Sequence, residues 1–116
     1  MRPVVYIASP YTKGDVALNV RESLLAADQV AQMGYLPLAP LLSHFWHMLC
    51  PHPYGFWMEL DLEWILHCDC VLRLPGESAG ADAEVAFARL HGVPVYYSIE
   101  GLPCLPTPES STSLDS

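Results

Sequence analysis

Apolar residues in this chain fall into short continuous runs that alternate with longer segments of mixed polarity. The continuous runs predict buried strands at about 4–8, 35–39, 70–74 and 93–97. In the segments between them, apolar residues recur every three or four positions, which predicts helices over about 15–33, 41–50, 56–67 and 79–91. Gly34 and Gly92 stand where glycine commonly ends a helix. Two prolines and a glycine make 51–55 a loop, and Trp57 and Trp64 are expected to point inward.

Alternation of strands and helices predicts an α/β fold, a flavodoxin-like or Rossmann-like three-layer sandwich with a four- to five-stranded parallel sheet. Ligands in such sheets bind beyond the carboxyl ends of the strands. That rule selects three segments, namely 8–15, 39–44 and 74–84. One domain is expected over residues 1–105. Residues 106–116, rich in Pro, Ser and Thr, are expected to be a disordered tail.

Composition narrows the range of partners. The 116 residues carry a net charge of −8 with only five Lys and Arg, so a nucleic acid polymer is not expected as a partner. The composition is still compatible with a single mononucleotide, which backbone N–H groups at a helix N-terminus and one or two cations can hold. The chain has no apolar stretch of membrane-spanning length, and its start lacks a signal-peptide pattern. A cytoplasmic location without membrane attachment is therefore expected. The four cysteines have no metal-type spacing and are interpreted as reduced and structural.

The segment 74–84 offers the clearest candidate chemistry, because it joins a strand end to a helix that begins with small residues. Ser78 can cap that helix or donate to a ligand, and Gly80 lets a ligand approach the backbone. Glu84 is a carboxylate in an otherwise apolar, Ala-rich stretch of helix. A plainer interpretation is that Asp82 and Glu84 are acidic residues favoured by the helix dipole.

A set of short motifs spread along the chain points to a known family. The motifs are Tyr6-x-Ala8-Ser9-Pro10-Tyr11, Asn19, Trp57-x3-Asp61, Cys68-Asp69 and Leu74-Pro75-Gly76-x-Ser78-x-Gly80-Ala81-x2-Glu84. In this pattern the chain resembles the nucleoside 2-deoxyribosyltransferase-like superfamily, and within it the small DUF4406-type branch. The superfamily also contains deoxynucleoside-monophosphate N-glycosidases and cytidine-monophosphate hydrolases. The resemblance extends from about residue 4 to residue 97.

The resemblance implies an enzyme that acts on the N-glycosidic bond of a nucleoside or nucleoside 5′-monophosphate. Glu84 would be the nucleophile at the anomeric carbon, Asp61 would assist the departing base, and Tyr6 would orient the nucleophile. The residues implied in substrate binding are Ser9, Pro10, Lys13, Asn19, Ser78, Gly80 and Asp82. No cofactor and no metal are implied. A homodimer or higher homo-oligomer is expected, because relatives often complete the pocket from a neighbouring subunit and the segment 45–57 is unusually apolar.

Each of these roles has a plainer alternative. Tyr6 could simply fill the core, and Asp61 shares its helix with Glu59 and Glu63, which favours a solvated face. Ser78 could be only a helix cap. Members of the superfamily that use a 5′-phosphate typically carry an early arginine, which this chain lacks at a firmly matching place, so Lys13 is the better candidate for a phosphate contact.

Histidines and aromatic residues gather between 44 and 57, where they invite two further interpretations. His44, His47 and His52 could form a metal site with Asp61, but no recognised ligand motif accompanies them and polar pocket lining is favoured. The aromatic side chains could stack on a base, although packing in the core or at a subunit interface is commoner. Two rival functions also stand beside the enzyme: a nucleotide-binding module without turnover, and a structural or interaction protein.

Overall fold

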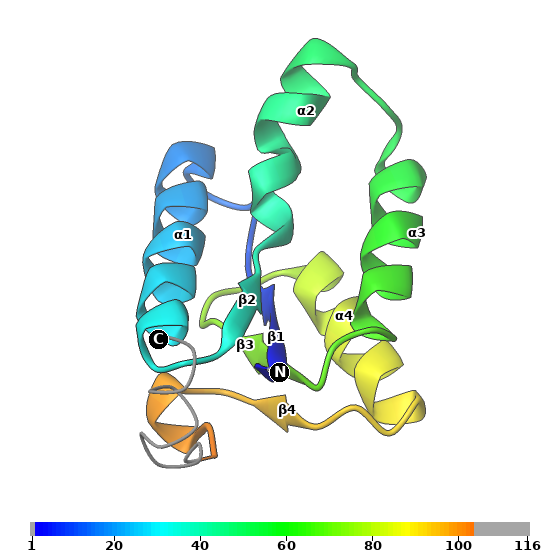
Figure 1. The fold of residues 1–116 in the computed structure, drawn as a ribbon. Coiled ribbons are helices and arrows are strands. Elements are labelled where there is room, and N and C mark those ends of the chain that lie inside the picture. Colours follow the sequence, from blue (N-terminus) through cyan, green and yellow to red (C-terminus); the bar gives the residue numbers. More distant parts are fainter. Residues whose placement is uncertain (1, 104–116) are drawn as a thin grey trace, which may run out of the picture.

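The computed structural model describes residues 2–103, so the tail predicted at 106–116 lies outside the described residues. The elements follow the alternating order that the sequence predicts (Figure 1). They are β1 (Val4–Ala8), α1 (Val16–Gln32), β2 (Leu36–Leu38), the 3-10 turn η1 (Pro40–Leu42), α2 (Ser43–Leu49), α3 (Tyr54–Ile65), β3 (Cys70–Arg73), α4 (Ala79–Leu90), β4 (Val95–Tyr96) and the 3-10 turn η2 (Ile99–Gly101).

The four strands form one parallel sheet in the order β2-β1-β3-β4. In register, Val4 of β1 lies opposite Leu36, and Val5 lies opposite Cys70. Each strand is joined to the next by a crossover that contains helix, as parallel strands require. The predicted three-layer α/β architecture is therefore confirmed, with four strands in the part of the chain that the structure describes.

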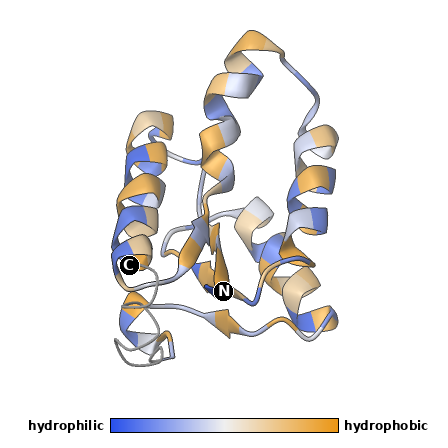
Figure 2. Ribbon diagram, viewed as in Figure 1, coloured by the Kyte–Doolittle hydropathy of each residue, from blue (hydrophilic) through white to orange (hydrophobic). Residues whose placement is uncertain are grey.

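Two cores cover the two faces of the sheet, because side chains alternate along each strand. Val5 and Ile7 of β1 pack toward α1 together with Val30, in a cluster that also contains Leu72. Tyr6 of β1 belongs to the other cluster, which is formed with α3 and α4. Figure 2 shows hydrophobic residues concentrated on the strands at the centre of the molecule. Alternate side chains of β1 therefore face α1 on one side of the sheet and α3 and α4 on the other.

Three local predictions need correction. Helix α3 begins at Tyr54, not at 56 or 57, so Tyr54 and Gly55 lie in its first turn. The first backbone N–H groups of a helix have no acceptor within the helix, so Gly55, two residues after the N-cap Pro53, is tolerated there. Trp64 is 53% exposed and does not point inward, whereas its neighbour Ile65 is fully buried. The strand predicted over 93–97 is paired only at Val95–Tyr96.

The chain after β2 rises through η1 and α2 and returns down α3, so that α2 stands above the carboxyl ends of the strands (Figure 1). The single helix predicted over 41–50 is thus divided into a 3-10 turn and a short α-helix. Large apolar side chains of α2 are exposed, among them Phe45, Met48 and Leu49. Within residues 2–103 no helix combines the length and the apolar character needed to cross a membrane.

Candidate active site

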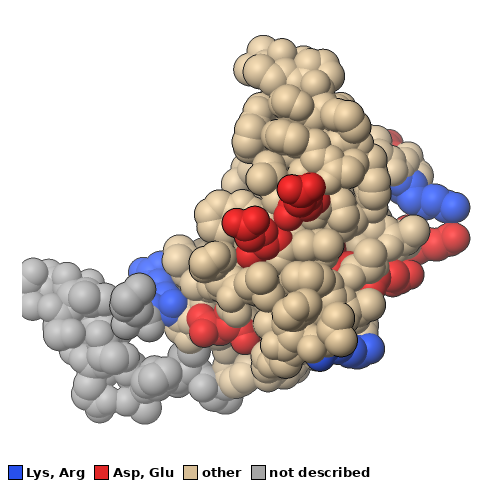
Figure 3. Space-filling model, turned by 90° about the vertical axis from the view of Figure 1, so that its right-hand side faces the viewer, with Lys and Arg blue, Asp and Glu red and all other residues tan. Residues whose placement is uncertain are grey.

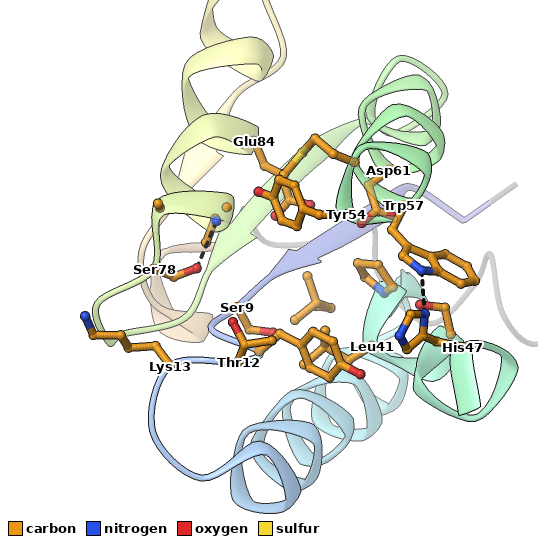
Figure 4. A pocket seen from close by; sticks show the side chains of 18 of the residues that line it. Ser9, Thr12, Lys13, Leu41, His47, Tyr54, Trp57, Asp61, Ser78 and Glu84 are labelled. Atoms are coloured by element: carbon orange, nitrogen blue, oxygen red, sulfur yellow. Dashed lines mark hydrogen bonds between the residues drawn. The ribbon is translucent and has the colours of Figure 1, made fainter. Parts of the chain in front are cut away.

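A cavity of about 550 Å³ opens at the carboxyl ends of the strands, where the fold predicts a ligand site. Its walls come from all three segments selected from the sequence and, in addition, from α3. Side chains from the end of β1, from the turn before α2, from α3 and from the start of α4 point into it (Figure 4). Of the residues expected at the site, the lining includes Ser9, Lys13, Asp61, Ser78, Gly80 and Glu84.

Glu84 lies in the second turn of α4 and is only 6% exposed, although its carboxyl group borders the cavity. The hydroxyl of Tyr6, which is fully buried on β1, donates a hydrogen bond of 2.5 Å to Glu84 Oε2. The pKa of Glu84 is raised to about 8, mainly because the group is buried; the Tyr6 hydrogen bond and Arg73 act to lower the pKa, and nearby Asp61 acts to raise it. The tyrosine of the first strand therefore does more than fill the core.

Asp61 projects from α3 into the same cavity, whereas its helix neighbours Glu59 and Glu63 are exposed. Burial raises the pKa of Asp61 to about 7. The solvated-face interpretation therefore applies to the two glutamates and not to Asp61. Asp61 and Glu84, called here the carboxyl pair, are two acids whose pKa values burial raises to about 7 and about 8, close to neutral pH. Such a pair can exchange a proton with a ligand or let one member act as a nucleophile.

The start of α4 forms the wall beside Glu84. Ser78 is the N-cap of α4, and its Oγ accepts a hydrogen bond of 3.0 Å from the backbone N–H of Ala81. It also lines the cavity, so capping and ligand contact are compatible for this residue. A Cβ at Gly80 would stand 3.1 Å from the hydroxyl of Tyr54, so glycine allows α3 and α4 to approach closely here.

Three of the residues expected in substrate binding lie outside the cavity lining, and each has a structural partner instead. The side-chain amide of Asn19 donates to the carbonyls of Tyr11 and Lys13 at 2.9 and 2.8 Å, so it shapes the loop after β1. Pro10 is buried against Gly76, whose φ of +119° favours glycine. Asp82 forms an ion pair instead of lining the cavity, since its Oδ1 lies 2.9 Å from Arg73 Nη2.

Arg73 is a functional candidate that sequence reasoning missed. It is only 8% exposed, and its guanidinium donates to the carbonyls of Leu74 and Gly76 as well as to Asp82. These bonds fix the loop between β3 and α4, which carries Ser78 into the cavity wall. The signal in the sequence was a single arginine inside an apolar strand, because a buried guanidinium needs partners for its five N–H groups.

Aromatic and histidine side chains of α2, α3 and the loop between them form another part of the cavity wall. Trp57 and Tyr54 of α3 line the cavity, and His47 of α2 holds the indole, since its Nδ1 lies 2.8 Å from Trp57 Nε1. The backbone N–H of His52 donates to the same Nδ1 at 3.3 Å. His44 Nδ1 lies 2.6 Å from the hydroxyl of Tyr11. Within residues 2–103, no three His, Cys, Asp or Glu side chains gather in a way that could hold a metal ion.

The fold and the site together define a three-layer α/β protein with a buried carboxyl pair in a cavity at the edge of a parallel sheet. Residues 3–98 match the family model described as "Domain of unknown function (DUF7768)", so the chain belongs to that family. This match does not support the narrower DUF4406-type assignment expected from the motifs. The curated proteins contain no match to the chain.

Among solved structures, the chain is similar to a 2-deoxyribosyltransferase from the psychrotolerant bacterium Bacillus psychrosaccharolyticus, which is described as a biocatalyst for the synthesis of nucleosides. The two share 20% sequence identity with a TM-score of 0.61, over 79% of this chain and 69% of that chain. At this identity the likeness establishes the shared fold. It agrees with the three-layer architecture expected for the superfamily.

Proposed function

We propose that this protein breaks the N-glycosidic bond of a nucleoside or nucleoside 5′-monophosphate, with Glu84 as the nucleophile. The observation that carries the proposal is the 2.5 Å hydrogen bond from buried Tyr6 to Glu84 Oε2 in a cavity that also contains Asp61. A nearly buried carboxyl group that borders a cavity is costly for the fold, which favours a chemical role. Similarity in fold to a 2-deoxyribosyltransferase supports glycosyl transfer as the general class.

The proposed reaction has two steps, in which Glu84 is the nucleophile and Asp61 acts first as an acid and then as a base. In the first step Glu84 attacks the anomeric carbon, the C–N bond breaks, and its electron pair leaves with the base, which receives a proton from Asp61. The product is a glycosyl ester on Glu84. In the second step ionised Asp61 takes a proton from water, and the oxygen of that water attacks the anomeric carbon and releases Glu84. A second base in place of the water would give transfer instead of hydrolysis.

Tyr6 acts in this scheme as a positioning residue. Its hydroxyl donates a hydrogen bond to Glu84 Oε2, so the other carboxylate oxygen, Oε1, is free to attack the sugar. The same hydrogen bond favours the ionised form and so lowers the pKa of Glu84, in opposition to burial. The hydrogen bond therefore increases the fraction of molecules whose nucleophile is ionised.

The size and the walls of the cavity suit a nucleoside. A volume of about 550 Å³ lies within the range of about 300–1,000 Å³ typical of small-molecule sites. Trp57 and Tyr54 offer aromatic surface for the base, while Ser9 and Ser78 offer hydroxyl groups to the sugar. Placing the base against α3 brings it near Asp61, which is the group that protonates it.

The test is a screen of the purified protein against ribo- and deoxyribonucleosides and their 5′-monophosphates, with liberated base measured by HPLC. Wild type is expected to release base, and Glu84→Gln is expected to lose at least about a thousandfold of that rate, as is usual for a nucleophile. Glu59→Gln is the matched control, since Glu59 is exposed on α3 outside the cavity. Activity retained in Glu84→Gln contradicts the proposed nucleophile. Tight nucleotide binding without release, even with a second base added, contradicts turnover and favours the binding module.

The proposal includes assembly into a homodimer or higher homo-oligomer. The exposed apolar side chains of α2 support it, because Phe45 and Met48 are each 63% exposed and Leu49 is 83% exposed. Light scattering during gel filtration is expected to give at least twice the mass of 12.8 kDa. A Leu49→Glu and Met48→Lys double variant is expected to shift that mass toward the monomer. A monomeric wild type contradicts this part of the proposal.

A further inference from the structure

The cavity is poor in available positive charge. Of the described side chains that line it, Lys13 is the single Lys or Arg, whereas Asp61, Glu77 and Glu84 are acidic. Lys13 Nζ lies 3.5 Å from Glu77 Oε2 at the rim, where both side chains are largely exposed. The charge of Lys13 is therefore matched by Glu77 before any ligand enters.

Arg73 lies near the same end of the sheet, and its positive charge is also already paired within the protein. Its guanidinium bonds the carbonyl of Gly76 at 3.0 Å and Asp82 at 2.9 Å, and it is absent from the cavity lining. On the face of the molecule in Figure 3, acidic side chains lie over the middle and basic ones lie only at the edges. With a net charge of −8, the molecule as a whole also repels anions.

The polar groups that remain in the cavity suit hydroxyl groups better than a phosphate. Ser9 lines the cavity, and its Oγ is buried with no hydrogen-bond partner within the described residues. An unpartnered buried hydroxyl gains by meeting a ligand that can both donate and accept, as a sugar hydroxyl does.

We infer that the cavity selects nucleosides with a free 5′-hydroxyl and discriminates against nucleoside 5′-monophosphates. The inference rests on the proposed function and sharpens its substrate class. A phosphate monoester carries a charge of about −1.5 to −2 at neutral pH. Its entry would bring this charge beside Glu77 and the carboxyl pair, with no unmatched cation in the lining to offset its lost hydration. A nucleoside enters without that cost.

Binding is tested first with Glu84→Gln, which keeps the ligand intact. Isothermal titration calorimetry is carried out with each ribo- and deoxyribonucleoside and with its own 5′-monophosphate. The free nucleoside is expected to bind at least about tenfold more tightly than its monophosphate, the difference that one unfavourable charge contact produces. The inference is overturned if the monophosphates bind as tightly as the nucleosides or more tightly. It is also overturned if none of the nucleosides and none of the monophosphates binds.

Charge variants at the rim test the cause. Glu77→Gln leaves Lys13 unpaired, so the affinity for monophosphate relative to nucleoside is expected to rise about threefold to tenfold. Lys13→Gln is expected to lower the same ratio. Glu59→Gln also removes one negative charge but lies outside the lining, and it is expected to leave the ratio unchanged. A ratio that responds equally to Glu77→Gln and Glu59→Gln overturns the local explanation.

Turnover by wild type separates the failure of this inference from that of the proposed function. Base released faster from nucleosides than from their monophosphates supports both. Base released mainly from monophosphates overturns the inference and leaves the glycosidic chemistry standing. Tighter binding of nucleosides to both wild type and Glu84→Gln, with no base released from any compound, overturns the chemistry and supports the inference.

Discussion

Replacing Glu84 with glutamine is expected to make the folded protein more stable at alkaline pH. Burial raises the pKa of Glu84 from its ordinary 4.5 to about 8. Since the folded state therefore binds more protons than the unfolded state between these values, wild type loses stability as the pH rises from about 4.5 through about 8. Glutamine keeps the shape of the neutral acid and does not titrate, so the variant avoids this loss.

The size of the effect follows from the two pKa values. One pKa unit corresponds to 1.36 kcal/mol, so the rise from 4.5 to about 8 corresponds to at most about 5 kcal/mol well above pH 8. Because Glu84 borders a cavity that is open to solvent, screening reduces this limit, and part of the effect is already present at pH 5. The gain in unfolding free energy from Glu84→Gln is therefore expected to be about 2–4 kcal/mol larger at pH 9 than at pH 5.

Urea unfolding followed by tryptophan fluorescence measures this gain at several pH values. Glu59→Gln serves as the control, because Glu59 is exposed and its replacement is expected to change stability by the same small amount at every pH. A gain from Glu84→Gln that is equal at pH 5 and pH 9, or a loss at pH 9, would refute the burial argument. A stability gain together with lost turnover is the pattern expected when a fold tolerates strain for its chemistry.

Three further predictions follow from the geometry. The rate of base release is expected to follow a bell-shaped pH profile with limbs near pH 7 and 8. The reaction needs one proton on the carboxyl pair, whose pKa values burial raises to about 7 and about 8. A rate that does not change between pH 6 and pH 9 contradicts this prediction. His47→Ala is expected to raise KM about tenfold with little change in kcat, because it frees the indole of Trp57, and His47→Gln, which keeps an acceptor, is expected to recover most of the loss; equal kinetics for both variants contradicts it. Gly76→Ala is expected to lower the unfolding free energy by about 2–4 kcal/mol, because its Cβ would stand 2.8 Å from Pro10 Cγ at a φ of +119°; a cost below about 0.5 kcal/mol in urea unfolding contradicts it.

Much of the fold could be predicted from the sequence, because buried parallel strands leave a clear trace. The run at Val4–Ala8 is apolar on both faces, which matches a central strand covered on both sides. Glu84 could also be recognised from the sequence, because a carboxylate is unusual within an Ala-rich stretch of helix. Prediction was weaker at the start of α3, where a glycine after a proline resembles a loop but serves as a first helical turn.

The partners of individual side chains could not be predicted, since they depend on contacts between distant segments. Asn19 matched a family motif, yet the fold directs its amide to the loop after β1 and away from the cavity. Asp82 likewise finds Arg73 nine residues earlier in the chain. Trp57 was expected to point inward, but sequence alone did not tell that it would line a cavity together with Asp61.

The central claim is that Glu84 carries the sugar during the reaction. Wild type and Asp61→Asn, which lacks the base of the second step, are mixed with a nucleoside whose base can depart without a proton from Asp61. The reactions are quenched in acid and digested, and the peptides are analysed by mass spectrometry. We expect the peptide that contains Glu84 to gain the mass of one pentosyl group, with more of this adduct in Asp61→Asn. Base release without an adduct in either protein, or an adduct on another residue, would contradict the account.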